Sequence, residues 1–156
     1  MIFATVGSHP SFRFDRFLRA LESLEVDDLV VQHGPGEPPS NAAVAVAWMS
    51  FADYLDHVYQ AEKVISHAGI GTILNATRAG QTPVVVPRLR RFKETVDDHQ
   101  LDLARSLDAT GRVVVVEDLD ELAARVAGAP PRSDTRPTAD SRLAEAVRLE
   151  LLARPA

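Results

Sequence analysis

The stretch richest in potential chemistry reads VISHAGIGTILN, from Val64 to Asn75. An apolar, β-branched run, which predicts a buried strand, ends at two glycines, Gly69 and Gly71, and a helical pattern follows at once. Glycines let the backbone approach a ligand closely, and a helix start offers unpaired N–H groups with partial positive charge. The pattern is typical of a phosphate or diphosphate site, although an ordinary tight turn between a strand and a helix has the same sequence.

Other polar groups follow the predicted strands in the same way. Thr72 would add a hydroxyl or cap the helix, and Asn75, one turn later, points back toward the same place. Gly7 and Ser8 follow the first apolar run, and the pair His33-Gly34 follows the second. Because parallel strands end at one edge of a sheet, we expect these turns to face a single ligand, whereas each alone is explained as a structural turn.

A second group of candidates follows the fifth apolar run. Four cations lie close together there: Arg88, Arg90, Arg91 and Lys93. They would screen a bound diphosphate, meet an anionic acceptor or lipid head group, or simply form a solvated loop. Asp98, His99 and Gln100 then open a helix, where they would cap it or hydrogen-bond a polyhydroxy ligand.

No recognisable catalytic motif accompanies these residues. His67 and His99 are expected to titrate near neutral pH, but no third residue at catalytic spacing marks a nucleophile–base pair. The sequence has no HExxH, no Walker motif and no His/carboxylate set with metal-ligand spacing. We therefore expect no metal site and no cofactor, and leave the catalytic residues unassigned.

The composition is that of a globular protein. The chain has 156 residues, of which 46% are hydrophobic and 25% charged, so one domain with a real core is expected. It has no cysteine, which excludes disulfides and thiolate chemistry. A net charge of −5, from 17 basic and 22 acidic residues, argues against non-specific nucleic-acid binding. Since no signal peptide and no apolar run of about 20 residues is found, we expect a cytoplasmic protein.

The elements that must position these residues alternate along the chain. Strands are predicted at 2–6, 29–32, 43–47, 64–66, 83–86 and 113–116, and helices at 14–24, 54–61, 72–79, 98–107 and 119–126. The alternation predicts a Rossmann-like α/β domain over residues 1–127, with a parallel sheet of about six strands and helices on both faces. Residues 128–140 are predicted to be a linker, and 141–156 to hold an amphipathic helix that packs on the sheet or docks a partner.

Four blocks of the sequence point to a family: IFATVGS (2–8), ISHAGIGT (65–72), GQTPVVVPR (80–88) and DDHQ (97–100). In this order they resemble the C-terminal domain of family 28 glycosyltransferases, over about residues 1–126. More narrowly, they look like the stand-alone PssE-type subunits of capsule and exopolysaccharide synthesis. Those are similar to the cytosolic subunit of the eukaryotic dolichol-linked N-acetylglucosaminyltransferase.

The resemblance implies half of a GT-B enzyme, which binds a nucleotide-sugar donor, usually a UDP-sugar. The other half, on a separate membrane-associated polypeptide, would hold the lipid-linked acceptor and recruit this chain to the inner face of the membrane. Gly7 and Ser8 would approach the diphosphate, and the backbone near Phe51 would meet the nucleobase. The full set of implied donor-binding residues is Gly7, Ser8, Phe51, His67, Gly69, Ile70, Gly71, Thr72, Asn75, Arg88, Asp98, His99 and Gln100.

One position departs from the family pattern. Where a glutamate commonly accepts the ribose hydroxyls, this chain has Asn75, whose amide accepts a hydrogen bond without charge assistance. No base for the acceptor hydroxyl is evident either. We therefore expect a metal-independent sugar transfer in which the partner supplies the base and this chain alone turns over little.

Two other functions stay open at this point. A non-catalytic nucleotide-sugar sensor or regulatory subunit is favoured by Asn75 and by the missing acceptor domain. A nucleotide-sugar epimerase or hydrolase would share the GT-B architecture, but such chains usually carry both domains. A Rossmann oxidoreductase is disfavoured, because GSHP after the first strand is not GxGxxG. Self-association is left open.

Overall fold

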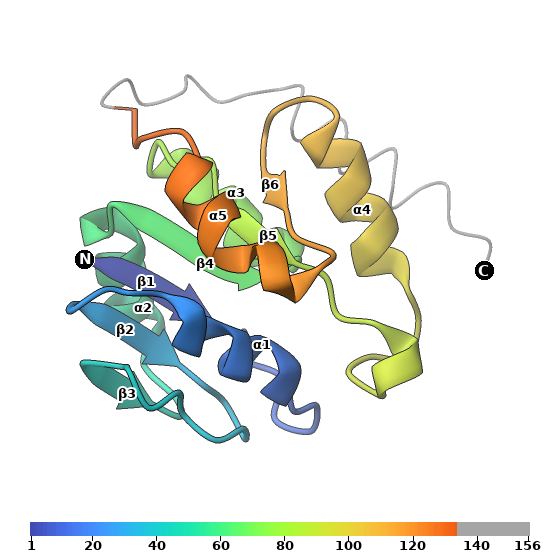
Figure 1. Ribbon diagram of the computed structural model, residues 1–156, viewed down its shortest axis with the longest axis horizontal. Coiled ribbons are helices and arrows are strands. Elements are labelled where there is room, and N and C mark those ends of the chain that lie inside the picture. The colour runs from blue at the N-terminus through green and yellow to red at the C-terminus, as the bar shows by residue number, and fades with distance from the viewer. Residues whose placement is uncertain (134–156) are drawn as a thin grey trace.

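Six parallel strands form one sheet in the order β3-β2-β1-β4-β5-β6 (Figure 1). The computed structural model describes residues 1–133, so most of the predicted linker and the whole predicted helix at 141–156 lie outside the described residues. The strands are β1 (Ile2–Thr5), β2 (Leu29–Gln32), β3 (Val44–Val46), β4 (Lys63–His67), β5 (Val84–Val86) and β6 (Val114–Val115). The strand order reverses between β1 and β4, and ligands of such sheets bind beyond the carboxyl ends at this point.

Helices cover both faces of the sheet. They are α1 (Asp15–Ala20), η1 (Leu21–Ser23), α2 (Phe51–Gln60), α3 (Ile70–Arg78), η2 (Arg90–Phe92), α4 (His99–Asp108), η3 (Leu119–Glu121) and α5 (Leu122–Gly128). In Figure 1, α1 and α5 lie in front of the sheet, and α2 and α3 lie behind it. The predicted Rossmann-like α/β fold is confirmed.

The core follows from the period of two along each strand. In β1, Ile2 and Ala4 pack with the residues of α1 and α5, whereas Phe3 packs with those of α2 and α3. A third cluster joins Val85 of β5 to the inner faces of α3 and α4. Because both faces are covered, every residue of β1, β2 and β5 is buried, which explains their continuous apolar runs.

Several element boundaries differ from the expected ones. The helix predicted at 54–61 begins at Phe51, because the Ser50 hydroxyl accepts a hydrogen bond from the Asp53 N–H at 3.1 Å and caps it. The helix predicted at 72–79 begins at Ile70, so Thr72 lies inside its first turn and is not the cap. The single helix predicted at 14–24 becomes a 3₁₀ turn at Leu21.

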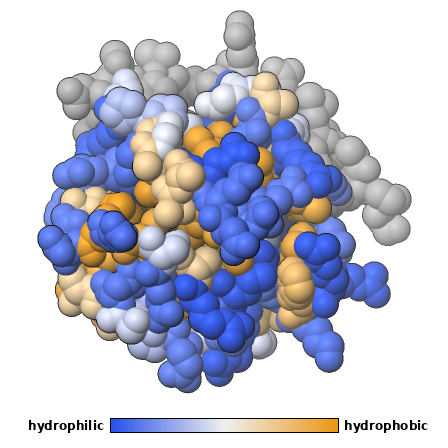
Figure 2. All heavy atoms as spheres, viewed as in Figure 1, coloured by the Kyte–Doolittle hydropathy of each residue, from blue (hydrophilic) through white to orange (hydrophobic). Residues whose placement is uncertain are grey.

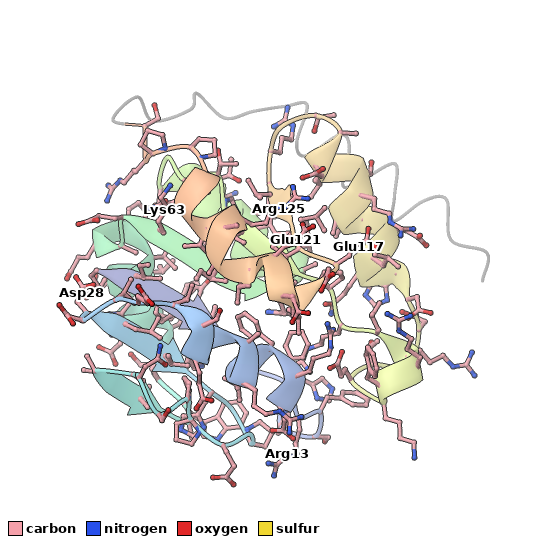
Figure 3. All side chains as sticks on the ribbon, viewed as in Figure 1. Arg13, Asp28, Lys63, Glu117, Glu121 and Arg125 are labelled. Carbon is pink, nitrogen blue, oxygen red and sulfur yellow. The ribbon has the colours of Figure 1, made fainter. Side chains whose placement is uncertain are left out.

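The two edges of the sheet have different chemistry. At the amino edge the charged Met1 nitrogen pairs with Asp28 at 2.6 Å, and Lys63 donates to the carbonyls of Ala129 and Pro130 (Figure 3). At the carboxyl edge, β1 and β2 end in neutral polar residues, Thr5 and Gln32. Charged groups therefore lie at the amino ends of β1 and β4, whereas β1 and β2 end in neutral polar residues.

The surface seen from the α1 and α5 side is mostly hydrophilic, with smaller apolar areas between the hydrophilic ones (Figure 2). Ion pairs such as Arg105–Glu117 at 2.7 Å and Arg125–Glu121 at 3.0 Å lie on the exposed helices and turns. Exposed pairs of this kind contribute little to stability. No helix within residues 1–133 combines the length and the apolar character needed to span a bilayer.

Candidate functional site

A cavity of about 370 Å³ opens at the carboxyl edge of the sheet. It is lined by nine residues from the turn after β1, the end of β2, the start of α2 and the first turns of α3: Gly7, Ser8, Gln32, Met49, Phe51, Tyr54, Gly71, Thr72 and Asn75. It therefore lies at the reversal of strand order, and its volume is in the range of small-molecule sites. Six of the predicted site residues meet here: Gly7, Ser8, Phe51, Gly71, Thr72 and Asn75.

Two glycines beside the cavity allow the ring of His67 to lie under both turns. Gly7 has φ +83°, and a Cβ on it would lie 2.5 Å from His67 Cε1. A Cβ on Gly69 would overlap His67 Nε2. Side chains at these two positions would displace the imidazole, so the glycines are required by the close approach as well as by the backbone angle of Gly7.

His67 is neutral at pH 7. Burial lowers its pKa to about 4, and the positive charge of Arg88 acts in the same direction. Its Nδ1 atom is buried and has no hydrogen-bond partner among residues 1–133. The expectation of a histidine titrating near neutrality is therefore wrong for His67, because the sequence did not show the burial of its ring.

At the start of α3, where Gly71 and Thr72 line the cavity, the first backbone N–H groups have no hydrogen-bond partner within residues 1–133. Gly69 is the N-cap and has no side chain to satisfy the first N–H groups. The first helical hydrogen bond runs from Ile73 N to Gly69 O at 3.1 Å, so the N–H groups of Ile70, Gly71 and Thr72 precede it. Space around Gly71 is open, since a Cβ added to this residue would meet no heavy atom within 4 Å. This turn is suited to an anionic group.

An aromatic wall closes the other side of the cavity. The Phe51 ring is 67% exposed and stacks on Tyr54, with ring centroids 5.9 Å apart and planes 21° apart. The Tyr54 hydroxyl is buried and has no hydrogen-bond partner among residues 1–133. A flat apolar surface of this kind suits the face of a heterocyclic ring. The sequence pointed only to the backbone near Phe51, whereas its side chain also lines the cavity.

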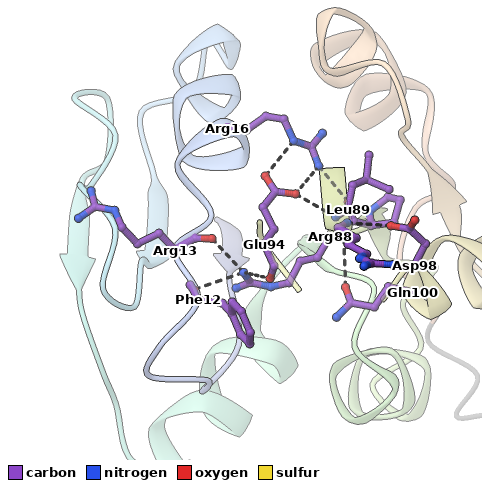
Figure 4. Close-up of polar contacts among 10 residues, drawn as sticks. Phe12, Arg13, Arg16, Arg88, Leu89, Glu94, Asp98 and Gln100 are labelled. Atoms are coloured by element: carbon purple, nitrogen blue, oxygen red, sulfur yellow. Dashed lines mark hydrogen bonds and ion pairs between the residues drawn. The ribbon is translucent and has the colours of Figure 1, made fainter. Parts of the chain in front are cut away.

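Arg88 lies in the protein interior and does not line the cavity (Figure 4). Its Nη2 donates to Val6 O at 2.8 Å, and its Nη1 to the carbonyls of Phe12, Arg13 and Glu94 at 3.1–3.3 Å. Burial lowers its pKa to about 10, with the Glu94 carboxylate opposing the shift, so the guanidinium stays charged at pH 7. Its contacts with Val6 and Phe12 hold both ends of the turn that carries Gly7 and Ser8.

Glu94 completes this buried cluster. Arg16 donates to its two carboxylate oxygens at 3.0 and 2.9 Å, and the Leu89 N–H donates to it at 3.0 Å. Arg16 also donates to Pro87 O at 3.0 Å. The Arg16–Glu94 pair therefore fastens the segment after β5 onto α1, as Figure 4 shows.

The three polar residues at the start of α4 contact other residues of the segment from Arg88 to Gln100. Asp98 accepts from the Arg90 N–H at 2.8 Å and makes no side-chain cap, Gln100 accepts from the Arg88 N–H at 3.2 Å, and His99 contacts Asp97. None of the three lines the cavity. Their role in donor binding stays a prediction, as does that of Arg88, His67, Gly69 and Ile70.

Three residues that line the cavity were missed by sequence reasoning: Gln32, Met49 and Tyr54. The last residue of β2, Gln32, lines the cavity, whereas His33 and Gly34 do not, and His33 Nδ1 contacts Gly36 O at 2.8 Å. A signal did exist, since Gln32 is the one polar residue of the strand LVVQ.

Among residues 1–133, no cluster of three His, Asp or Glu side chains is placed to hold a metal ion.

Comparison with known families decides what kind of domain this is. The sequence model of the glycosyltransferase family 28 C-terminal domain matches residues 1–146. The chain belongs to this family. Its fold is the Rossmann-like half of a GT-B glycosyltransferase, as predicted.

Curated relatives share the name UDP-N-acetylglucosamine transferase subunit ALG13. The protein of Yarrowia lipolytica is 29% identical over 112 residues, covering 67% of this chain and 55% of the relative. The human protein is 33% identical over 101 residues, covering 62% of this chain and 8% of the relative. A Cryptococcus neoformans protein is 31% identical, covering 77% of this chain and 76% of the relative. This family 28 domain thus spans about half of the first of these relatives and a small part of the second.

Solved glycosyltransferases share the architecture. The glycotransferase of kitacinnamycin matches with a TM-score of 0.58 and 25% identity, covering 97% of this chain and 39% of that chain. SnogD from Streptomyces nogalater matches with a TM-score of 0.50 and 18% identity, covering 98% of this chain and 43% of that chain. The family 28 domain therefore corresponds to about two fifths of each of these chains.

Proposed function

We propose that this chain is the donor-binding subunit of a two-component glycosyltransferase that uses a UDP-sugar. The observation that carries the proposal is the cavity itself, with free backbone donors on one side and an aromatic wall on the other. A nucleoside diphosphate has the same two parts, an anionic chain and a flat ring. Relatives named as UDP-N-acetylglucosamine transferase subunits support the choice of uridine.

In this proposal the leaving diphosphate is stabilised by the protein without a metal ion. The turn at Gly7 and Ser8 and the N–H groups at the start of α3 approach the phosphates from two sides. Preorganised N–H donors stabilise charge that develops on a leaving group. Asn75 then accepts a ribose hydroxyl, and the nucleobase lies against Phe51.

The acceptor and the base come from a partner in the same proposal. Within residues 1–133, the cavity lining includes no aspartate, glutamate or histidine suited to take the proton of an acceptor hydroxyl. We assign this step, and the binding of a lipid-linked or polysaccharide acceptor, to a membrane-associated subunit. The chain would act in the cytoplasm, at the inner face of the membrane, in a pathway such as exopolysaccharide synthesis.

Calorimetric titration of the purified chain tests the donor site. UDP and UDP-sugars are expected to bind more tightly than GDP or ADP, with and without EDTA. Gly71→Asp should weaken UDP binding at least about tenfold, because it places a carboxylate beside the phosphates where there is open space. Gly128→Asp, at an equally open position on α5, should leave binding unchanged. Failure of the wild-type chain to bind any nucleotide would refute the proposal.

A transfer assay tests the two-component arrangement. Sugar transfer should need both this chain and the membrane subunit. Robust transfer by this chain alone would refute the partner requirement, and donor binding that never supports transfer with the partner present would indicate a regulatory subunit instead.

A further inference from the structure

We propose that Gln32 is a specificity-determining residue of the cavity, and that its amide nitrogen donates a hydrogen bond to an acceptor oxygen of the bound nucleotide. The inference rests on the proposed function. It comes from three observations, which are the burial of Gln32, the orientation of its amide and the absence of an acceptor for its nitrogen within residues 1–133.

Gln32 is a buried polar side chain in the wall of the ligand cavity. It is 5% exposed, ends β2, and is paired in register with Thr5 of β1. It lines the cavity together with Gly7 and with Phe51 and Tyr54 of α2. Buried carboxamides are normally hydrogen-bonded at both ends, so an unfilled end at a cavity points to a ligand.

Thr5 contacts the oxygen end of the Gln32 amide. Its Oγ1 accepts a hydrogen bond from the Gly7 N–H at 3.0 Å. The hydroxyl has one hydrogen, and this is directed at Gln32 Oε1, 2.7 Å away. Because the oxygen is held by Thr5, the nitrogen of the same planar amide is turned away from it.

The nitrogen has no protein acceptor within residues 1–133. The hydrogen bonds of the Gln32 side chain in this part of the chain are confined to the one from Thr5. Its two N–H groups are therefore available at the cavity, where they match an oxygen that only accepts. Uracil carbonyls and phosphate oxygens are such atoms, whereas sugar hydroxyls both donate and accept.

The same contacts give Thr5 a positioning role. One hydroxyl joins the Gly7 turn to the Gln32 amide, so a single side chain contacts both the turn and the proposed donor. Loss of this hydroxyl would free the amide to rotate and leave the Gly7 N–H without its acceptor.

The experiment replaces the donor with an acceptor of the same shape. Gln32→Glu should weaken binding of UDP and of UMP at pH 7.5 about tenfold, because a carboxylate oxygen then faces an acceptor of the ligand. Gln60→Glu carries the same substitution and charge change at an exposed position of α2 outside the cavity, and should bind as the wild type does. Equal losses for UDP and UMP place the contact on the nucleoside or its first phosphate, and a loss for UDP alone places it on the second.

A pH series separates a ligand contact from a structural role. As pH falls from 7.5 to 5, protonation of the new carboxyl restores a donor, so the affinity of Gln32→Glu should recover relative to that of Gln60→Glu. Thr5→Val should weaken binding about threefold to tenfold, whereas Thr5→Ser, which keeps the hydroxyl, should retain wild-type affinity. Thermal unfolding of each variant confirms that it is folded.

The failures can be told apart. If the wild-type chain binds no nucleotide, the proposed function is wrong. If it binds UDP and the folded Gln32→Glu and Thr5→Val variants bind equally well, the role of Gln32 is wrong and the proposed function stands.

Discussion

The sequence predicted ligand-binding residues both around the cavity and in the segment from β5 to the start of α4, yet the two regions differ in their hydrogen bonding. Around the cavity, the first N–H groups of α3, the Asn75 amide and the Gln32 nitrogen have no hydrogen-bond partner within residues 1–133. In the second region, the Arg88 guanidinium donates to four backbone carbonyls, and Asp98 and Gln100 accept from backbone N–H groups.

The difference indicates a binding role for the first region and a structural role for the second. The first region keeps its donors available for a ligand, whereas the second uses its charged groups to hold the first in place. Arg88 reaches the carbonyl of Val6, next to Gly7, so the Gly7 turn depends on a side chain from a distant segment. In this structure the Arg88 guanidinium is bonded to backbone carbonyls beside the Gly7 turn, and its role in donor binding stays a prediction.

Removal of the Arg88 guanidinium is expected to have the largest effect on stability. Arg88→Met should lower the free energy of unfolding by about 3–5 kcal/mol, because buried carbonyls and Glu94 lose a charged partner. It should also weaken UDP binding through the Gly7 turn. Urea unfolding and calorimetry measure the two effects. Arg90→Met, at an exposed position of the same segment, is the control, and equal behaviour of both variants would contradict the supporting role.

The pKa of His67 depends first on burial and second on the charge of Arg88. The unfolded chain binds a proton below about pH 6.5, and the folded chain only below about pH 4. The free energy of unfolding should therefore be unaffected above pH 6.5 and fall by up to about 3 kcal/mol as pH drops to 4. Urea titrations across this range should show a flatter profile for His67→Gln.

The pKa of His67 should also change when the charge of Arg88 is removed. Removal of the positive charge in Arg88→Met should raise the pKa of His67 toward its ordinary value, measured by NMR of the imidazole protons. An unchanged pKa would mean that burial alone sets it.

A comparison of Gly→Ala variants at Gly7 and Gly111 separates the cost of a steric contact with His67 from the cost of a positive φ. Both have positive φ, +83° and +70°, but a Cβ on Gly111 meets nothing within 4 Å. Gly111→Ala should cost about 1 kcal/mol of stability from the backbone alone, and Gly7→Ala about 2 kcal/mol or more because His67 must also move. Only Gly7→Ala should weaken UDP binding. Equal losses of stability in thermal unfolding would mean that the His67 ring moves aside without a cost in free energy.

The smallest expected effect concerns Asn75. Asn75→Glu should tighten UDP binding by about 1 kcal/mol, roughly fivefold, because a carboxylate accepts ribose hydroxyls with charge assistance. Asn75→Gln, of the same length and neutral, should give no such gain. The gain should also be absent with 2′-deoxy-UDP, and a gain that survives this change would place Asn75 away from the 2′-hydroxyl.

The sequence by itself determined the fold class, the six strands and the glycine turns beside the cavity. These depend on local patterns, since apolar β-branched runs, helical periodicity and glycines can be recognised without knowing their neighbours. Gly7, Gly71 and Asn75 were placed correctly at one edge because the carboxyl ends of parallel strands must meet there.

Only the tertiary structure decided which polar groups are free and which are used. Arg88 bonds to Val6 from 82 positions away, and Thr5 orients Gln32 from 27 positions away. The burial that holds His67 neutral has the same origin. Hydrogen bonding and desolvation depend on atoms brought together by folding, so residue type and spacing along the chain do not reveal them.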